Sequence, residues 1–381
     1  MFYGTLLYNI ADQMIGFFLP LFLFGIGSTL AVFSWLHVAP FVSGILFVVM
    51  YYALQRAVVL FTIFPLSRLM YRLGYVWSMV IGTLFLCGNF IGFYLAKTDP
   101  RFITLSFICG GIDMVLYWVA HDSLFAHEIC VKEIGRGVGA LAFLTKLIQI
   151  AVPAVSGLII VFSGYDSLFR IGIVFLLLSC IPFFFIPHTR IHALPKVREL
   201  LSWLRESRFQ KFAVAQVGTY MDVIALLMWP IYVLIVVGKI ERVGYIFSLV
   251  LFLSLVLTYI TGWVVDHKRG KKAFLTSGTI VSLNWAVRLF ARGVWDIIGI
   301  ELIAKLAGSV YSACYDSFLC KRSKGNSVFA FYIYKEFLLS IDALLLWAAV
   351  FILFLLPVAW TSIFLLGALG VALSLFLDAK K

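Results

Sequence analysis

Long apolar runs separated by short polar stretches constrain this chain more than any other feature. The sequence contains about twelve such runs of roughly 20 residues, the length that an α-helix needs to cross the hydrocarbon core of a bilayer. Of its 381 residues, 63% are hydrophobic and only 13% are charged, whereas about 25% of the residues in a soluble domain are charged. We therefore predict an all-α membrane protein, since a helix satisfies its own backbone hydrogen bonds within the bilayer.

The apolar runs predict twelve transmembrane helices in two groups of six. The first six cover residues 3–25, 40–66, 75–96, 102–120, 137–163 and 168–186, and the second six cover residues 212–237, 243–265, 273–291, 295–315, 327–354 and 358–377. We expect six-helix bundles at residues 1–187 and 212–381, joined by a linker at 188–211. Within this linker, the spacing of Leu200, Leu201 and Leu204 predicts a short amphipathic helix on the membrane surface.

The basic residues predict how the chain is oriented. Its net charge of +12 lies mostly in alternate loops, for example at Arg68, Arg72 and residues 268–272. The positive-inside rule places these loops, and with them both termini, in the cytoplasm. The charge thus indicates topology rather than nucleic-acid binding. Because no basic leader or small-residue cleavage site is evident at the start of the sequence, we expect the first run to be a retained span of a multi-pass plasma (inner) membrane protein.

The two halves of the chain repeat the same features in the same order. The matched residues are Asp12 and Asp222, each followed eight residues later by a proline, Lys146 and Lys335, Gly82 and Gly278, Asn89 and Asn284, and Asp122 and Asp316. An even number of spans separates the copies, so both have the same orientation in the membrane. The expected arrangement is two six-helix bundles related by a pseudo-two-fold axis along the membrane normal.

One loop connects this architecture to a known family. The segment Gly262-Trp263-Val264-Val265-Asp266-His267-Lys268-Arg269-Gly270-Lys271-Lys272 resembles the signature loop of the major facilitator superfamily, and residues 67–74 resemble a degenerate copy. Arg136-Gly137, which opens the fifth span, matches the family as well. The resemblance implies a secondary transporter that works by alternating access. It also implies that loop residues control switching, and the gating candidates are Asp266, Arg136, Asp122, Asp316, Gly262 and Gly270.

Two further stretches bear on the direction of transport. Val152-Pro153-Ala154-Val155-Ser156-Gly157 is similar to a degraded form of the Gly-Pro motif of family antiporters, which favours efflux by antiport. The fourth span has Asp113 near the place where drug/proton antiporters of the family carry an arginine, which weakens an assignment as a drug exporter.

Charged residues inside the apolar runs are the candidate substrate and proton-coupling site. Asp12, Lys146, Asp222 and Lys335 each lie about 14 to 17 Å from the predicted cytoplasmic end of their helix, and we expect Asp12 to pair with Lys146 and Asp222 with Lys335. Asp113, Lys305 and Arg56 lie near the same depth, and Glu336 adjoins Lys335.

These charges admit two roles. The ion pairs either hold each bundle together or take part in transport, and poor stabilisation by buried ion pairs favours transport. Desolvation favours the protonated form of a buried carboxyl group, which makes Asp12 and Asp222, and then Asp113, the candidate proton carriers. Lys146, Lys335 and Arg56 could then receive a substrate carboxylate or phosphate. Because the acids and bases balance, the sequence does not set the charge of the substrate.

Several other functions compete with solute transport. A lipid or lysolipid flippase of the same fold and a non-transporting membrane sensor are the alternatives. An enzyme is not expected, because the charges lie at mid-depth and not at one membrane face. The spacing of His121, Asp122, His127, Glu128 and Cys130 matches no metal site known to us, so we predict neither metal nor cofactor. The expected state is a monomer whose partners are a small solute, protons and the bilayer.

Overall fold

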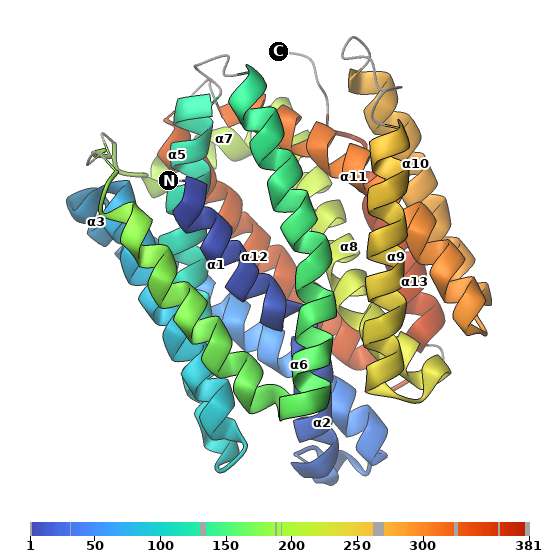
Figure 1. The fold of residues 1–381 in the computed structure, drawn as a ribbon. Coiled ribbons are helices and arrows are strands. Elements are labelled where there is room, and N and C mark those ends of the chain that lie inside the picture. The colour runs from blue at the N-terminus through green and yellow to red at the C-terminus, as the bar shows by residue number, and fades with distance from the viewer. Residues whose placement is uncertain are drawn as a thin grey trace.

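The computed structural model describes residues 2–30, 32–129, 135–186, 189–191, 193–261, 270–323, 327–356 and 359–377, and within these every regular element is helical (Figure 1). The first half contains α1 (Phe2–Gly16), α2 (Leu19–Leu30), α3 (Pro40–Ala96), α4 (Ile103–Asp113), a π-helical segment η3 (Met114–Trp118), α5 (Val119–Ile129) and α6 (Gly135–Phe183). The remainder contains α7 (Val197–Leu204), α8 (Ser207–Val237), α9 (Ile240–Thr261), α10 (Gly270–Val287), α11 (Val294–Ser323), α12 (Val328–Leu353) and α13 (Ala359–Ser374). Short 3-10 turns occupy Ser34–Leu36, Pro100–Phe102 and Arg288–Phe290.

Two of these helices fold back on themselves at glycines. A straight helix of the 57 residues of α3 would be about 85 Å long, far beyond the thickness of a bilayer. At Gly74 the backbone turns with a φ of 77°, and α6 turns at Gly164 with a φ of 74°. Because glycine adopts positive φ at little cost, each turn separates two of the predicted spans. The second and third spans thus lie on α3, and the fifth and sixth lie on α6.

The two prolines of the repeated Asp-to-Pro spacing lie at different places in their helices. The sequence predicts one helix over residues 3–25, but α1 ends at Gly16 and α2 begins at Leu19. Pro20 lies in the first turn of α2, where its missing N–H has no helical partner to lose. The matched Pro230 instead lies inside the continuous helix α8.

Seven stretches of the described chain are long and apolar enough to cross a membrane, and two of the shorter helices are also apolar. The seven include α3, which holds two predicted spans. These stretches support a multi-pass membrane protein. Twelve crossings and the cytoplasmic position of both termini stay predictions.

Matched residues of the internal repeat make similar contacts. The side-chain amide of Asn89 donates to the carbonyl oxygen of Ser106 at 2.9 Å, and that of Asn284 donates to the carbonyl oxygen of Ile300 at 3.0 Å. In each case a buried asparagine ties its helix to the next one along the chain. The two-fold relation between the halves is a prediction that these local contacts favour.

Helix packing places the two halves against each other. α12 packs on α3 and α5, and α6 packs on α9, while α1 packs on α6 and α8 packs on α13 and α12. The seventh predicted span, on α8, thus lies beside the eleventh, on α12, and the first lies beside α6, which carries the fifth and sixth. The predicted amphipathic helix is α7, whose Leu200 is buried and whose Leu201 is exposed. It lies at the end of the bundle where α1 begins (Figure 1).

Candidate functional site

Asp113, the last residue of α4, is enclosed by aromatic side chains. It is 3% exposed, and the hydroxyl of Tyr8 on α1 donates a hydrogen bond to its Oδ2 at 2.7 Å. The Tyr8 ring stacks on Tyr117, with 3.5 Å between centroids, and meets Trp118 edge-on at 5.8 Å. Within the described residues, Asp113 Oδ1 has no hydrogen-bond partner and the carboxyl group has no ion pair with a basic side chain. This buried acid therefore lacks a countercharge among the described side chains.

The backbone is irregular at the same place. Directly after Asp113 the α-helix gives way to the π-helical segment η3, which carries both Tyr117 and Trp118, before α5 continues at Val119. Single π-helical turns inside α-helices occur frequently at functional sites. The irregular backbone and the aromatic wall of the buried acid thus coincide.

Exposure increases along one row of α1 that begins beside this enclosed acid. Tyr8, Asp12 and Gly16 are spaced four residues apart, so they lie on one face of the helix. Tyr8 is buried, Asp12 is half-buried, and Gly16 is exposed with nothing within 4 Å of the position of a Cβ atom. The Asp12 carboxyl group lies within electrostatic range of both Tyr8 and Asp113. Asp12 therefore stands between the enclosed acid and an open face of α1.

A second group of charges joins the two halves of the chain. Arg56 Nη1 on α3 lies 3.2 Å from Glu336 Oε2 on α12, and Lys335 Nζ on α12 lies 3.7 Å from Asp122 Oδ2 on α5. Lys335 also lies 3.2 Å from Glu336 Oε1, and His121 Nδ1 lies 3.2 Å from Asp122 Oδ1. We call these five residues the inter-half network. It contains two ion pairs that form only while α12 contacts α3 and α5.

Aromatic contacts extend the inter-half network. The Arg56 guanidinium lies 5.0 Å from the ring centroid of Tyr220 on α8, within cation–π range. Trp347 on α12 donates its indole N–H to the Tyr220 hydroxyl at 2.9 Å, and Tyr52 on α3 stacks on Trp347 at 5.5 Å. The interface of α3 with α8 and α12 therefore combines charge and ring contacts.

A third cluster lies inside the second half and was not predicted from the sequence. Arg288 Nη2 is 2.7 Å from Glu301 Oε1, and these side chains are only 2% and 3% exposed. The guanidinium lies 3.7 Å from the Trp285 ring centroid and 4.3 Å from that of Trp229. Trp285 Nε1 donates to Asp222 Oδ1 at 2.6 Å. A fully enclosed arginine thus holds a carboxylate and two indoles together.

A signal for this cluster exists in the sequence. Arg288 lies only three residues before the predicted end of its span, where an arginine ordinarily reaches the membrane interface. The next predicted span carries Glu301, which is an opposite charge within reach on the neighbouring helix. A search for opposite charges on consecutive spans would have found the pair.

The predicted pairing of Asp222 with Lys335 is wrong. Asp222 accepts its hydrogen bond from Trp285, while Lys335 contacts Asp122 and Glu336. Equal depth along two helices does not make their side chains face each other. Two other candidates form no ion pair with a described side chain. Lys305 is exposed on α11, and Asp316, also exposed, lies within electrostatic range of Asp122 and Lys335.

Several predicted site residues lie outside the described residues, or have side chains that are not described. Gly262 and Asp266 fall between α9 and α10, and Gly270 is the first residue of α10. Arg136 and Lys146 belong to α6, but their side chains are not among those described. The Asp12–Lys146 pair and the roles of the signature loop therefore stay predictions.

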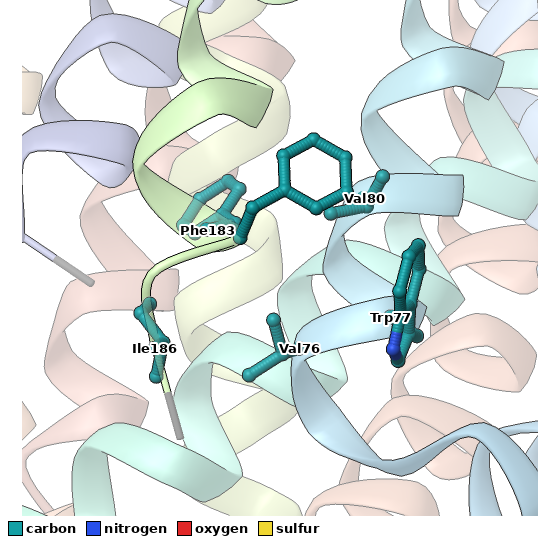
Figure 2. Close-up of a pocket in the computed structure, with 6 residues that line it drawn as sticks. Val76, Trp77, Val80, Phe183 and Ile186 are labelled. Carbon is teal, nitrogen blue, oxygen red and sulfur yellow. The ribbon is translucent and has the colours of Figure 1, made fainter. Parts of the chain in front are cut away.

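The pocket in Figure 2 does not contain these charges. Its lining is Val76, Trp77 and Val80 of α3 with Phe183, Phe184 and Ile186 at the end of α6. Trp77 and Phe184 are exposed, whereas Phe183 is fully buried. An apolar recess with exposed rings at its rim suits contact with lipid chains and not binding of a polar solute.

Among the described side chains, no group of three or more His, Cys, Asp or Glu residues is placed to hold a metal ion. His121 is instead engaged with Asp122 in the inter-half network. The side chains of His127, Glu128 and Cys130 lie outside the described residues.

Comparison with known proteins places this geometry in context. The sequence model of the Major Facilitator Superfamily matches residues 1–334, and no curated protein matches the chain. The structure is similar to the human organic anion transporter MFSD10 (TETRAN), with a TM-score of 0.69 and 12% identity over 99% of this chain and 97% of the other. It is also similar to the E. coli fucose:proton symporter FucP, with a TM-score of 0.61 and 14% identity over 98% and 95% of the two chains. A structure of FucP in the outward conformation gives a TM-score of 0.63 with 11% identity over 99% and 98%.

Proposed function

Since this chain belongs to the major facilitator superfamily, it is a secondary transporter and not an enzyme, and we propose that it moves a small organic solute by alternating access coupled to protons. The solved structures with this fold share too little sequence with it to specify a substrate. The proposal for its chemistry therefore depends on the residues of this chain.

The observation that carries proton coupling is the enclosed acid at Asp113. Its carboxyl group is buried, lacks an ion-pair partner among the described side chains and has one oxygen without a hydrogen bond. Desolvation of such a group favours the neutral, protonated form. Asp12, half-buried on the row that leads to Gly16, is the second proton site in this proposal, because it stands between Asp113 and open space.

Asp222 is the third candidate proton site, and its surroundings differ. It accepts a hydrogen bond from Trp285 and lies within electrostatic range of Arg288. Both interactions stabilise the ionised form. We therefore expect Asp222 to contribute less to proton coupling than Asp113 does.

Alternating access requires contacts that form in one state and separate in the other. The Arg56–Glu336 and Lys335–Asp122 pairs supply such contacts, because each joins a residue of the first half to one of the second. Glu336 and Lys335 are adjacent on α12, so separation of α12 from α3 and α5 breaks both pairs. In this proposal the two six-helix bundles, residues 1–187 and 212–381, move against each other about this interface.

The remaining parts of the proposal follow from sequence. The degraded Gly-Pro stretch at 152–157 favours efflux by antiport. The loop charges favour a plasma (inner) membrane protein with both termini in the cytoplasm. The carrier is expected to work as a monomer.

The test is flux into proteoliposomes driven by an imposed proton gradient, with a screen of organic solutes. Asp113→Asn is expected to abolish gradient-driven flux, and Asp12→Asn is expected to weaken coupling. Asp166→Asn is the matched control, because Asp166 forms a half-exposed pair with Lys97 at 2.8 Å. Gradient-driven flux that survives in the Asp113→Asn and Asp12→Asn proteins would show that these carboxyl groups do not carry the protons.

The same assay separates the two alternatives. A lipid or lysolipid flippase would move a labelled lipid between leaflets without moving any soluble solute. A sensor would bind a solute without net flux. Either outcome would replace solute transport as the function.

A further inference from the structure

We infer that the substrate carried by this transporter is an organic cation, and that it binds at Asp113 within the aromatic side chains of α1 and η3. This inference rests on the proposed function and adds the charge class of the solute, which the sequence left open. It follows from three features of the described chain: how the buried charges are paired, which rings surround Asp113, and how that acid is connected to open space.

The pairing of charges leaves an excess of carboxyl groups. Arg56 and Lys335 are matched by Glu336 and Asp122, and Arg288 is matched by Glu301. Each of these enclosed cations already holds a carboxylate, so none of them offers a free charge to an anionic solute. In the first half these pairs leave over Asp113 and Asp12, and in the second half they leave over Asp222, which accepts a hydrogen bond from Trp285. A carboxylate without a countercharge is costly in a low-dielectric interior, and a bound cation would remove that cost.

The surroundings of Asp113 suit an organic cation better than a metal ion. Tyr8 donates its hydroxyl to the carboxyl group, and its ring contacts those of Tyr117 and Trp118, so an aromatic cluster adjoins Asp113. Aromatic rings attract cationic groups through their quadrupole. The titratable groups facing Asp113 among the described side chains are Tyr8, Asp12, Tyr117 and Cys87. None of these is cationic. One oxygen of Asp113 is left without a partner, and few hard oxygen ligands are present for a metal ion.

We propose that a cation reaches this site along one face of α1. Asp12 lies one turn beyond Tyr8, and the exposed Gly16 lies one turn beyond Asp12. A cation that enters beside Gly16 meets the half-buried Asp12 first and the enclosed Asp113 second. Because a proton and an organic cation neutralise the same carboxyl group, occupancy by one excludes the other. Exchange of the two across the membrane is then antiport, the direction of coupling in the proposed function.

The experiment compares two ions of nearly the same size and shape but opposite charge, tetraphenylphosphonium and tetraphenylborate. Binding of each is measured to the full-length protein in nanodiscs, with empty nanodiscs as the blank. We expect saturable binding of tetraphenylphosphonium that weakens at least tenfold in Asp113→Asn and stays within about threefold of wild type in Asp113→Glu. Tyr8→Leu, which removes one ring, is expected to weaken binding about fivefold. Asp166→Asn is the control and should bind as wild type does.

The Asp113→Glu variant keeps the test informative if Asp113→Asn fails to fold, which size-exclusion chromatography of each protein would reveal. In that case the charge-retaining Glu variant must bind the cation and Tyr8→Leu must weaken it. Equal tetraphenylphosphonium affinity in wild type and Asp113→Asn would overturn the inference, as would Asp113-dependent binding of tetraphenylborate. Proton-driven flux of a neutral or anionic solute without cation binding would overturn it and leave the proposed function standing. Asp113-dependent cation binding without any proton-linked flux would overturn the proposed function and leave the cation site standing.

Discussion

Lys335 is the residue at which the structure makes its sharpest mechanical prediction. Its ammonium group lies 3.7 Å from Asp122 Oδ2 in the first half and 3.2 Å from Glu336 Oε1 on its own helix. Only the first of these contacts depends on the two halves being together. Lys335→Met keeps a side chain of similar length on α12 and removes that attraction.

The size of the effect follows from the distance and the exposure of the pair. Two unit charges 3.7 Å apart attract by about 4 kcal/mol at an effective dielectric constant of about 20. The side chains are 13% and 31% exposed, and the desolvation cost offsets much of this attraction, leaving a net value of about 1–2 kcal/mol. Loss of that amount multiplies the population of the separated state about five- to thirtyfold.

Double electron–electron resonance between two spin labels measures the population of the separated state. Position 71 on α3 and position 272 on α10 are exposed and lie in different halves, so labels there, in a cysteine-free background, report separation. Lys97→Met is the matched control, because Lys97 pairs with Asp166 within the first half. The reasoning is refuted if Lys335→Met leaves the distance distribution unchanged, or if Lys97→Met shifts it equally.

Three other perturbations follow from the described contacts. Glu301→Gln leaves the Arg288 charge enclosed without its carboxylate and should lower the free energy of unfolding by about 3–5 kcal/mol. In thermal unfolding, the double variant Arg288→Met/Glu301→Leu should lose less stability than either single variant. The Tyr334 hydroxyl accepts a hydrogen bond from the backbone N–H of Lys196 in the linker and donates one to its C=O, both at 2.7 Å. Tyr334→Phe removes both bonds at a cost of about 1–2 kcal/mol, so trypsin should cut the linker about five- to thirtyfold faster. An unchanged cleavage rate would contradict the docking of the linker. Gly82→Ala places a Cβ atom 2.7 Å from a backbone nitrogen of η3 and should destabilise the protein by about 1–3 kcal/mol. Gly25→Ala is the control and should not destabilise it, because no atom lies within 4 Å of a Cβ at that position. Equal unfolding temperatures of the two variants would contradict this packing.

The helical, apolar character of the described stretches was predictable because the bilayer imposes a one-dimensional rule. Apolar length locates a helix regardless of its neighbours. The described parts of the predicted spans are therefore helical, although α3 and α6 each carry two spans and the first span is divided between α1 and α2. The turns at Gly74 and Gly164 fall between predicted spans for the same reason. The amphipathic helix of the linker followed likewise from residue spacing, because its pattern is local.

The partners of the buried charges were less predictable. Depth along a helix follows from counting residues, but facing depends on the rotation of each helix and on which helices meet. Asp222 and Lys335 lie near one predicted depth, yet Asp222 faces Trp285 and Lys335 faces Asp122 across the inter-half boundary. Arg288 escaped notice for a related reason, since only the folded bundle shows that it turns inward between two indoles.

The sequence by itself thus determined that this is a multi-pass helical membrane protein, which belongs to a transporter family and carries repeated charges in its spans. The tertiary structure decided which of those charges neutralise one another and that Asp113 keeps no described countercharge. The physical reason is that hydrophobic length acts on each helix separately, whereas electrostatic pairing acts between side chains that only the packing of several helices brings within a few ångströms.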